Sequence, residues 1–278
     1  MRTKQPGGLL GPCACSTQGA ELVCICTLYR KALFPTYVLR IGPILYKTVI
    51  LDDTRKTHTA KSTFQLFVAN LDYRRPEFYS THVKNLWISA TGDLNDFKRI
   101  LTICSGVENL LLPSMGHVIP ASWTKDPAIE LVEHLNASSS RLRRMTALGP
   151  HSPWPNFEYA CFANITHLHL HGCDDWSRLK GFELLHSLTH LAVEWCRPEQ
   201  LALAMLKLPA VKYVAICKYE THEYGHPMAN RRVPIEMHGI NVVLVDGVTI
   251  VDWERGANGG ADFWDVVEKE VALRRAKV

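Results

Sequence analysis

The sequence predicts an α/β fold in which short parallel strands lie side by side in a leucine-rich-repeat-like solenoid, with helices on the outer side. The first observation is the segment ITHLHLHGC at residues 165–173, which has the apolar first, fourth and sixth positions of such a strand. The second is that the pattern returns from Leu188 and again from Val211, with an equal step each time. A constant step within ~20–29 residues indicates stacked repeats that bury a shared interior.

Six strand frames of this kind can be counted along the chain. They begin at Val83, Val107, Leu142, Ile165, Leu188 and Val211. The steps between them are nearly equal except for the longer one from Val107 to Leu142, which is expected to hold an insertion between strands. A further strand is predicted at residues 46–51, because this segment is rich in β-branched residues and ends at the turn signal Asp52-Asp53.

Helices are expected between the strands. The segments with helical character are 63–71, 93–104, 127–135, 174–185 and 198–208. Several of them start with a capping residue or with a proline in the first turn, where a missing N–H costs nothing. A strand with one such helix cannot cover its own apolar side, so stacking of the repeats supplies the core.

The N-terminal end differs from the repeats, which we assign to residues 46–240. Residues 1–20 contain glycine and proline without periodicity, so we expect a disordered leader there. Residues 21–45 have apolar positions for one or two short helices, broken at Pro35 and Pro43. They predict a small helical N-terminal segment.

Residues 241–278 are expected to follow the repeats as a β pair and a capping helix. The apolar segments 242–245 and 248–251 flank Asp246-Gly247, a dipeptide favoured in two-residue hairpin turns. A helix over 262–275 has acidic residues in its first turn and arginines in its last, which complements the helix dipole. Its apolar face consists of Phe263, Val266, Val267 and Val271. Such a helix fits the open end of a stack.

Composition and charge limit the classes of function and partner. With 47% hydrophobic and 21% charged residues the chain is typical of ordered soluble proteins. A net charge of +4 with scattered Lys and Arg argues against nucleic acid as a partner, and no apolar run is long enough to span a membrane. Nine cysteines in apolar frames and the lack of a signal-peptide pattern favour a cytoplasmic or nuclear protein.

Several segments resemble the fungal F-box and leucine-rich-repeat-like proteins. They are RIGPILYKTVIL at 40–51, VKNLWI at 83–88, FKRILTICSGVENLLLP at 97–113, the two THL frames, and DWERGANGGADFW at 252–264. The resemblance implies an F-box that docks on the adaptor of a cullin-RING ubiquitin ligase, and a repeat region that selects a client protein. Before Arg40 the leucine-proline opening of an F-box is missing, so we expect the box to be truncated or degenerate.

The repeat register places the third, fifth and seventh residues of each frame on the concave face of the sheet. The third row is Asn85, Asn109, Arg144, His167, His190 and Tyr213; the fifth is Trp87, Leu111, Thr146, His169, Ala192 and Ala215; the seventh is Ser89, Pro113, Leu148, His171, Glu194 and Cys217. Neighbours in a row are expected ~4.8 Å apart. Four histidines and a glutamate therefore converge on two adjacent strands.

This patch has three interpretations: a partner-binding surface, a divalent metal site, or a plain solvated surface. We predict partner binding, because Trp, Tyr and Arg are enriched where proteins anchor one another. The predicted partner-binding residues are Trp87, Arg144, His167, His169, His171, His190, Glu194 and Tyr213. We assign no metal and no cofactor. The sequence thus predicts a non-catalytic protein-interaction scaffold, the client-recruiting part of an F-box-type ligase by resemblance.

An alternative function comes from the segment HEYGH at 222–226, which matches the zinc metalloprotease pattern HExxH. That chemistry needs His222 and His226 on one face of a helix, with Glu223 as general base. Gly225 weakens a helix here, and Pro227 disfavours α geometry at the residue before it. We therefore expect a polar loop and keep a zinc-dependent hydrolase as the alternative.

Overall fold

Short strands at regular intervals organise the computed structural model, which describes residues 42–53, 61–89, 92–112, 134–135, 141–148, 156–171, 179–193, 198–218, 236–237, 240–246 and 249–276. The strands are β1 Thr48–Asp52, β2 Asn85–Ser89, β3 Asn109–Leu112, β4 Arg144–Leu148, β5 His167–His171, β6 His190–Val193, β7 Tyr213–Lys218, β8 Glu236–Met237 and β9 Ile240–Asp246. All six predicted frames and the strand expected at 46–51 are therefore confirmed.

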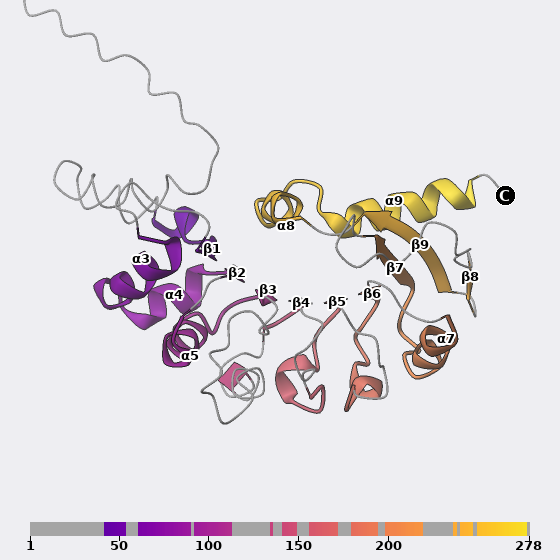
Figure 1. Ribbon diagram of the computed structural model, residues 1–278, viewed down its shortest axis with the longest axis horizontal. Helices are drawn as coiled ribbons and strands as arrows, with labels where there is room; N and C mark the ends of the chain where they lie inside the picture. The colour runs from indigo at the N-terminus through magenta and orange to yellow at the C-terminus, as the bar shows by residue number, and fades with distance from the viewer. Residues whose placement is uncertain are drawn as a thin grey trace, which may run out of the picture.

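The fold is α/β, and its strands form one sheet in the order β1-β2-β3-β4-β5-β6-β7-β9-β8. Strands β1 to β7 and β9 are parallel, and β8 pairs antiparallel with β9 at one edge. Figure 1 shows the strands following one another along an arc, with helices on both its outer and its inner side. The side that faces into the arc is called the inner face below.

The predicted register is also confirmed. Asn85, Asn109, Arg144, His167, His190 and Tyr213 pair in one line across the sheet. Each step is held by one carbonyl that accepts two N–H groups of the next strand: Thr166 O accepts from Thr189 N and His190 N, both at 3.0 Å. Thr48 and Asn241 extend the line at its two ends. A shift of one residue would break these bonds and turn every side chain to the other face.

Helices and short 3₁₀ turns cover the outer side of the sheet (Figure 1). They are α3 Thr63–Asn70, η2 Leu71–Tyr73, α4 Pro76–His82, α5 Leu94–Ile103, η4 Ala160–Phe162, η6 Phe182–Leu184 and α7 Pro198–Leu206. The helices predicted at 63–71, 93–104 and 198–208 are confirmed. Of the segment 174–185, the described part holds only the turn η6, and of 127–135 only residues 134–135 are described.

Local signals explain where these helices begin. Ser62 and Gln65 form a capping box at the start of α3, and Asp93 accepts a hydrogen bond from Asn95 N at the start of α5. The helix α4, which begins with Pro76, is not among the predicted elements. Its seven residues are fewer than the window in which a helical period can be recognised.

The main core lies between the sheet and the outer helices. The first, fourth and sixth residues of the frames are buried there, except for the partly buried Ala147; Ile165, Leu168 and Leu170 have 0% exposure each. Phe97 and Ile100 of α5 belong to the same cluster. Because successive side chains of a strand alternate between faces, the residues between them point to the inner face.

The β hairpin predicted around Asp246-Gly247 is wrong. Residues 242–245 do belong to a strand, β9, but that strand pairs with β7 and β8. The last two residues of the predicted second strand, 250 and 251, start the helix α8 Ile250–Ala257. Thr249 and Asp252 form a capping box there, with Asp252 N bonded to the Thr249 hydroxyl at 3.1 Å. This helix-start signal outweighs the turn signal before it.

The C-terminal helix is confirmed as α9 Phe263–Arg275, with Asp262 as its N-cap, but its expected position is wrong. It does not close the end of the stack; it lies across the inner face, where it packs on β7 and β9 (Figure 1). Val266, expected in its apolar face, is 48% exposed, and Trp264 is buried instead. The buried residues Val267 and Val271 join Ala192, Ala215 and Val243 of the sheet in one cluster.

No helix in the described ranges is long and apolar enough to cross a membrane. The predictions for the N-terminal end fall largely outside the described residues: the leader at 1–20 entirely, and the helical segment at 21–45 except for a helical turn at 42–45.

Candidate functional site

The inner face carries a stack of rings that follows directly from the parallel register. His167 and His190 lie face to face with ring centroids 4.1 Å apart and an interplanar angle of 9°. His190 stacks in turn on Tyr213 at 4.7 Å and 16°. These spacings are close to the strand separation of ~4.8 Å, because residues at the same position of adjacent parallel strands lie side by side.

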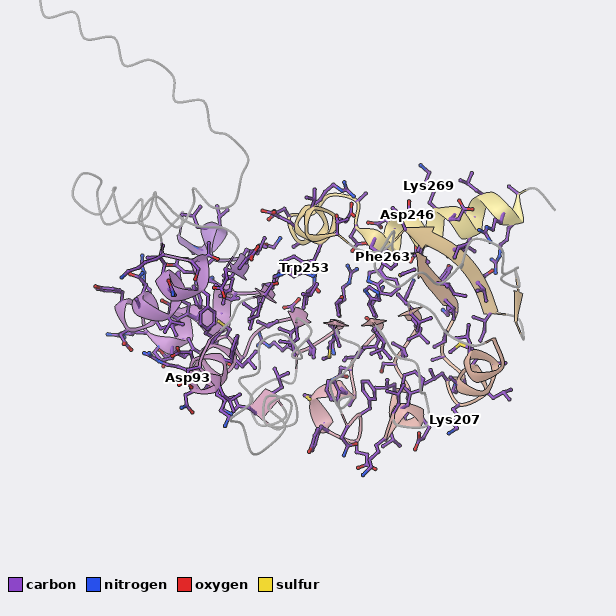
Figure 2. All side chains as sticks on the ribbon, in the orientation of Figure 1. Asp93, Lys207, Asp246, Trp253, Phe263 and Lys269 are labelled. Carbon is purple, nitrogen blue, oxygen red and sulfur yellow. The ribbon has the colours of Figure 1, made fainter. Side chains whose placement is uncertain are left out.

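The C-terminal segment, residues 249–276, covers this face with α8 and α9. Trp253 of α8 meets Trp87 edge to face, with ring centroids 5.3 Å apart. The ring of Trp264 in α9 lies nearly perpendicular to those of His167 and His190, with ring centroids 5.2 Å and 5.6 Å apart. Figure 2 shows Trp253 and Phe263 between the helices and the sheet, whereas Lys269 points away from it.

Polar contacts fix the C-terminal segment to the sheet at several points. Arg144 forms an ion pair with Asp262, and His190 Nε2 lies 3.0 Å from Glu268 Oε1. Asn85 Nδ2 donates to the Ala257 carbonyl at 3.1 Å, and Arg274 Nη1 donates to the Val242 carbonyl at 3.4 Å. These contacts are spread from β2 to β9, so the segment is held along its length.

Asp262 has two roles in this arrangement. Its carboxylate accepts hydrogen bonds from Trp264 N at 2.8 Å and Asp265 N at 3.0 Å, which caps α9. The same carboxylate pairs with the Arg144 guanidinium. The start of α9 is therefore tied to β4 by the residue that also defines where the helix begins.

The two stacked histidines are held neutral. Burial, together with the nearby His190 and Arg144, lowers the pKa of His167 to about 3. Burial also lowers the pKa of His190, partly opposed by its hydrogen bond to Glu268. A carboxylate only accepts hydrogen bonds, so Nε2 of neutral His190 carries the hydrogen. Its Nδ1 lies 2.8 Å from the oxygen of the Thr189 hydroxyl, which donates to the Thr166 carbonyl at 3.1 Å.

The structure corrects the prediction that these side chains form an open surface. Trp87, His169 and His190 are only 6%, 0% and 7% exposed. The rings of Trp253, Phe263 and Trp264 pack on them. The strand pattern identified the face correctly, but it carried no information about where the C-terminal helices dock.

The remaining predicted site residues have different environments. Arg144, His167 and Tyr213 are half-buried at the edge of the covered region. His171 is the last residue of β5, but its side chain lies outside the described part of the structure, as does Glu194. The structure therefore brings together Arg144, His167, His190 and Tyr213 in one row, with Trp87 and His169 in the next.

A small cavity lies where α8 and α9 meet above β3 and β4. Asn109, Arg144, Trp253, Gly256, Ala257, Asp262, Phe263 and Trp264 line it, and its volume is about 30 Å³. Small-molecule sites usually have ~300–1,000 Å³, so this cavity is large enough only for water or the tip of a side chain. It does not have the size of a substrate site.

The described residues provide no zinc site, either for the histidine patch or for the HEYGH hypothesis. Within them, no three His, Cys, Asp or Glu side chains come together in a way that could hold a metal ion. The HEYGH segment with His222, Glu223 and His226 lies outside the described residues. Cys104, Cys161 and Cys217 are buried.

No protein-family model matches this chain, and a search of curated proteins finds no match either. The residues that sequence reasoning missed are those that cover the inner face: Trp253, Trp264 and Glu268, with Asp262 predicted only as an acidic residue in the first turn of the helix. The signal that could have found them is the fifth row itself. Its residues Leu111, Ala192 and Ala215 are apolar, and a solvated face would not be.

Proposed function

We propose that this protein is a non-catalytic protein-interaction scaffold of the leucine-rich-repeat type, whose inner face binds a client protein. The observation that carries the proposal is the row of Arg144, His167, His190 and Tyr213, which lie in register on four adjacent strands. Arginine and aromatic side chains are the types that most often anchor protein partners. Rigid parallel strands keep such anchors at fixed spacings, which favours recognition over catalysis.

The repeat assignment has its own support. The equal steps between the last three frames, the buried first, fourth and sixth positions and the outer helices or turns after the strands are all typical of leucine-rich repeats. We therefore propose a solenoid of this class for the region from β1 to β9.

By its resemblance to the fungal F-box and leucine-rich-repeat-like proteins, we further propose that the scaffold recruits its client to a ubiquitin ligase in the cytoplasm or nucleus. A cullin-RING adaptor would then contact the region before residue 42. Chain 42–278 retains every described element, so that region can be removed to test this contact separately.

The test is affinity capture from cells of the source organism, with the full chain, chain 42–278, and the full chain carrying Trp264→Ala. Because Trp264 packs on His167 and His190, its removal should loosen α9 and increase capture of clients. The adaptor should be recovered only with the full chain. Adding Arg144→Glu to Trp264→Ala should remove the clients again.

The matched control is Lys269→Ala, a change on the outward side of α9 (Figure 2). It should leave the captured proteins unchanged. All chains are first shown to be folded by circular dichroism. If the full chain, chain 42–278, the Trp264→Ala chain and the chain with both Trp264→Ala and Arg144→Glu then capture the same client proteins, the inner face is not the binding surface. If the adaptor is recovered equally without residues 1–41, the proposed ligase contact is wrong.

A further inference from the structure

We propose that the inner face recognises an amphipathic helix of one defined pattern, and that α9 is the chain's own copy of this ligand, which a partner helix displaces. The pattern is an acidic N-cap, two aromatic residues directly after it, an acidic residue in the second turn, and valine-sized residues between. In this chain it reads DFWDVVEKEV from Asp262 to Val271. The inference rests on the proposed function and names the chemistry of the partner.

One ion pair and one hydrogen bond between the helix and the sheet set the acidic positions of the pattern. Asp262 pairs with the Arg144 guanidinium, and Glu268 accepts a hydrogen bond from the neutral imidazole of His190. The helix dipole also favours an acidic residue at the start of a helix. A carboxylate at the N-terminus of a helix that meets Arg144 is therefore stabilised both by the dipole and by the guanidinium. A partner helix with a basic start would place like charges together at this point.

The aromatic pair fits the sheet in a specific way. Phe263 stacks on His169 at 5.8 Å, while Trp264 meets the stacked rings of His167 and His190 in a T-shaped arrangement. Adjacent helix residues point about 100° apart, so both rings reach the sheet where the two side chains lie on either side of the line along which the helix contacts it. The position of two neighbouring aromatics after the N-cap is therefore a specific requirement of this surface.

The apolar part of the inner face under α9 accepts only small branched side chains. Val267 and Val271 pack with Ala192, Ala215, Cys217, Val243 and Val245. The two alanines in the fifth row leave room for a helix to approach closely. A partner with bulkier residues one turn apart would be held away from the sheet, because interiors tolerate little excess volume.

The contacts of the covering segment are of a kind that allows displacement. The Nε1 groups of Trp87 and Trp253 are buried and have no acceptor among the described residues, which disfavours the closed arrangement compared with solvated donors. The polar contacts of α9 are open to water at their edges, since Glu268 and Arg144 side chains are 51% and 39% exposed. Exposed pairs of this kind contribute little stability.

Tethering keeps the face closed in the free protein. A covalently linked helix acts at an effective concentration on the order of millimolar, so a separate helix of equal intrinsic affinity competes poorly. A partner must therefore bind more tightly than α9, or meet a chain in which α9 is loosened. The native chain should therefore bind a peptide copy of its own helix weakly, and a chain in which α9 is loosened should bind that peptide tightly.

The probe is a fluorescein-labelled synthetic peptide with the sequence of residues 260–276, titrated against the full chain and followed by fluorescence anisotropy. We expect Trp264→Ala to bind it about tenfold more tightly than the native chain, and Trp264→Ala with Arg144→Glu to lose that gain. A peptide that carries Asp262→Lys and Trp264→Ala should not bind. Lys269→Ala in the full chain is the matched control and should bind like the native chain.

A second variant guards against failure of Trp264→Ala to fold. Asp262→Asn with Glu268→Gln removes the two carboxylates that contact Arg144 and His190, whereas asparagine still caps the helix, so this variant should also bind the peptide more tightly. Equal peptide affinity for the native chain and both folded variants would overturn the proposal. So would a concentration-dependent dimer of the variants that excludes the peptide, because the occupant would then be a second copy.

The two proposals fail in different ways. If Trp264→Ala captures clients through Arg144 but does not bind the peptide, the scaffold function stands and the helix pattern is wrong. If it captures no client in an Arg144-dependent way and does not bind the peptide, both proposals are wrong.

Discussion

The indole rings of Trp87 in β2 and Trp253 in α8 meet edge to face, at 5.3 Å between centroids and 76° between planes. Both residues are only 6% exposed, and neither Nε1–H has a hydrogen-bond acceptor among the residues that the structure describes. The contact therefore joins the N-terminal half of the sheet to the C-terminal segment through apolar area alone. It stabilises the closed arrangement and at the same time leaves two donors unsatisfied.

This contact predicts a large difference between two substitutions of Trp253. Trp253→Ala should lower the free energy of unfolding by about 3–5 kcal/mol, as is usual for a buried tryptophan. Trp253→Phe keeps a ring against Trp87 and removes one unsatisfied donor, so its loss should stay within about 1.5 kcal/mol. Urea unfolding followed by circular dichroism measures both. Val251→Ala, at a position 63% exposed in the same helix, is the control and should change little.

The double role of Asp262 predicts that Asp262→Ala destabilises the protein more than Asp262→Asn does, and that the difference equals the contribution of the helix cap. Arg144→Ala and Asp262→Asn each remove the ion pair and should each cost about 0.5–1 kcal/mol, because the Arg144 side chain is 39% exposed. Asp262→Ala also removes the cap and should cost about 1 kcal/mol more. Thermal unfolding of the three variants checks this order. Equal losses for Asp262→Asn and Asp262→Ala would contradict the capping role.

The sheet can be predicted because its determinants are local. Apolar first, fourth and sixth positions are a property of each short frame, and the recurring step between frames carries them to the next strand. Register then follows from the backbone bonds that each frame repeats. This is why the sequence predicts the third row, from Asn85 to Tyr213, residue by residue.

The covering of the site cannot be predicted from the same pattern. Where α9 docks depends on contacts between residues far apart in the chain, such as His190 with Glu268 and Arg144 with Asp262. The sequence shows that α9 is amphipathic, but not which face of the sheet receives it. Val266 and Trp264 illustrate the difference, because the orientation of the helix exposes the first and buries the second.

Two glycines with positive φ offer a matched test of the backbone around the repeats. Gly181 has φ 69°, and a Cβ there would lie 2.5 Å from Glu158 N. Gly259, between α8 and α9, has φ 88°, and no described atom lies within 4 Å of the place that a Cβ would take. Gly259→Ala should lower the free energy of unfolding by about 1–2 kcal/mol, because alanine is strained in the left-handed conformation. Gly181→Ala carries the same cost plus a backbone clash, so its loss in thermal unfolding should be clearly larger.

The stacked histidines predict that acid destabilises the closed protein. The pKa of His167 is lowered to about 3 from the ordinary 6.5, so between these values the unfolded chain binds more protons than the folded one. Stability is then full above pH 6.5 and falls as the pH drops toward 3, and the lowered pKa of His190 acts in the same direction. Between pH 7 and pH 5 we expect a loss of about 1 kcal/mol, reduced from the full linkage value by the partial exposure of His167.

Urea unfolding at several pH values between 5 and 7 measures this loss above the range in which ordinary carboxyl groups titrate. The groups that face the pair are Arg144, Tyr213, Asp262 and Glu268. His167→Phe keeps a ring in the stack but cannot bind a proton, so its stability should depend less on pH over the same range. An equal slope for native protein and variant would show that His167 is not the group that acid protonates.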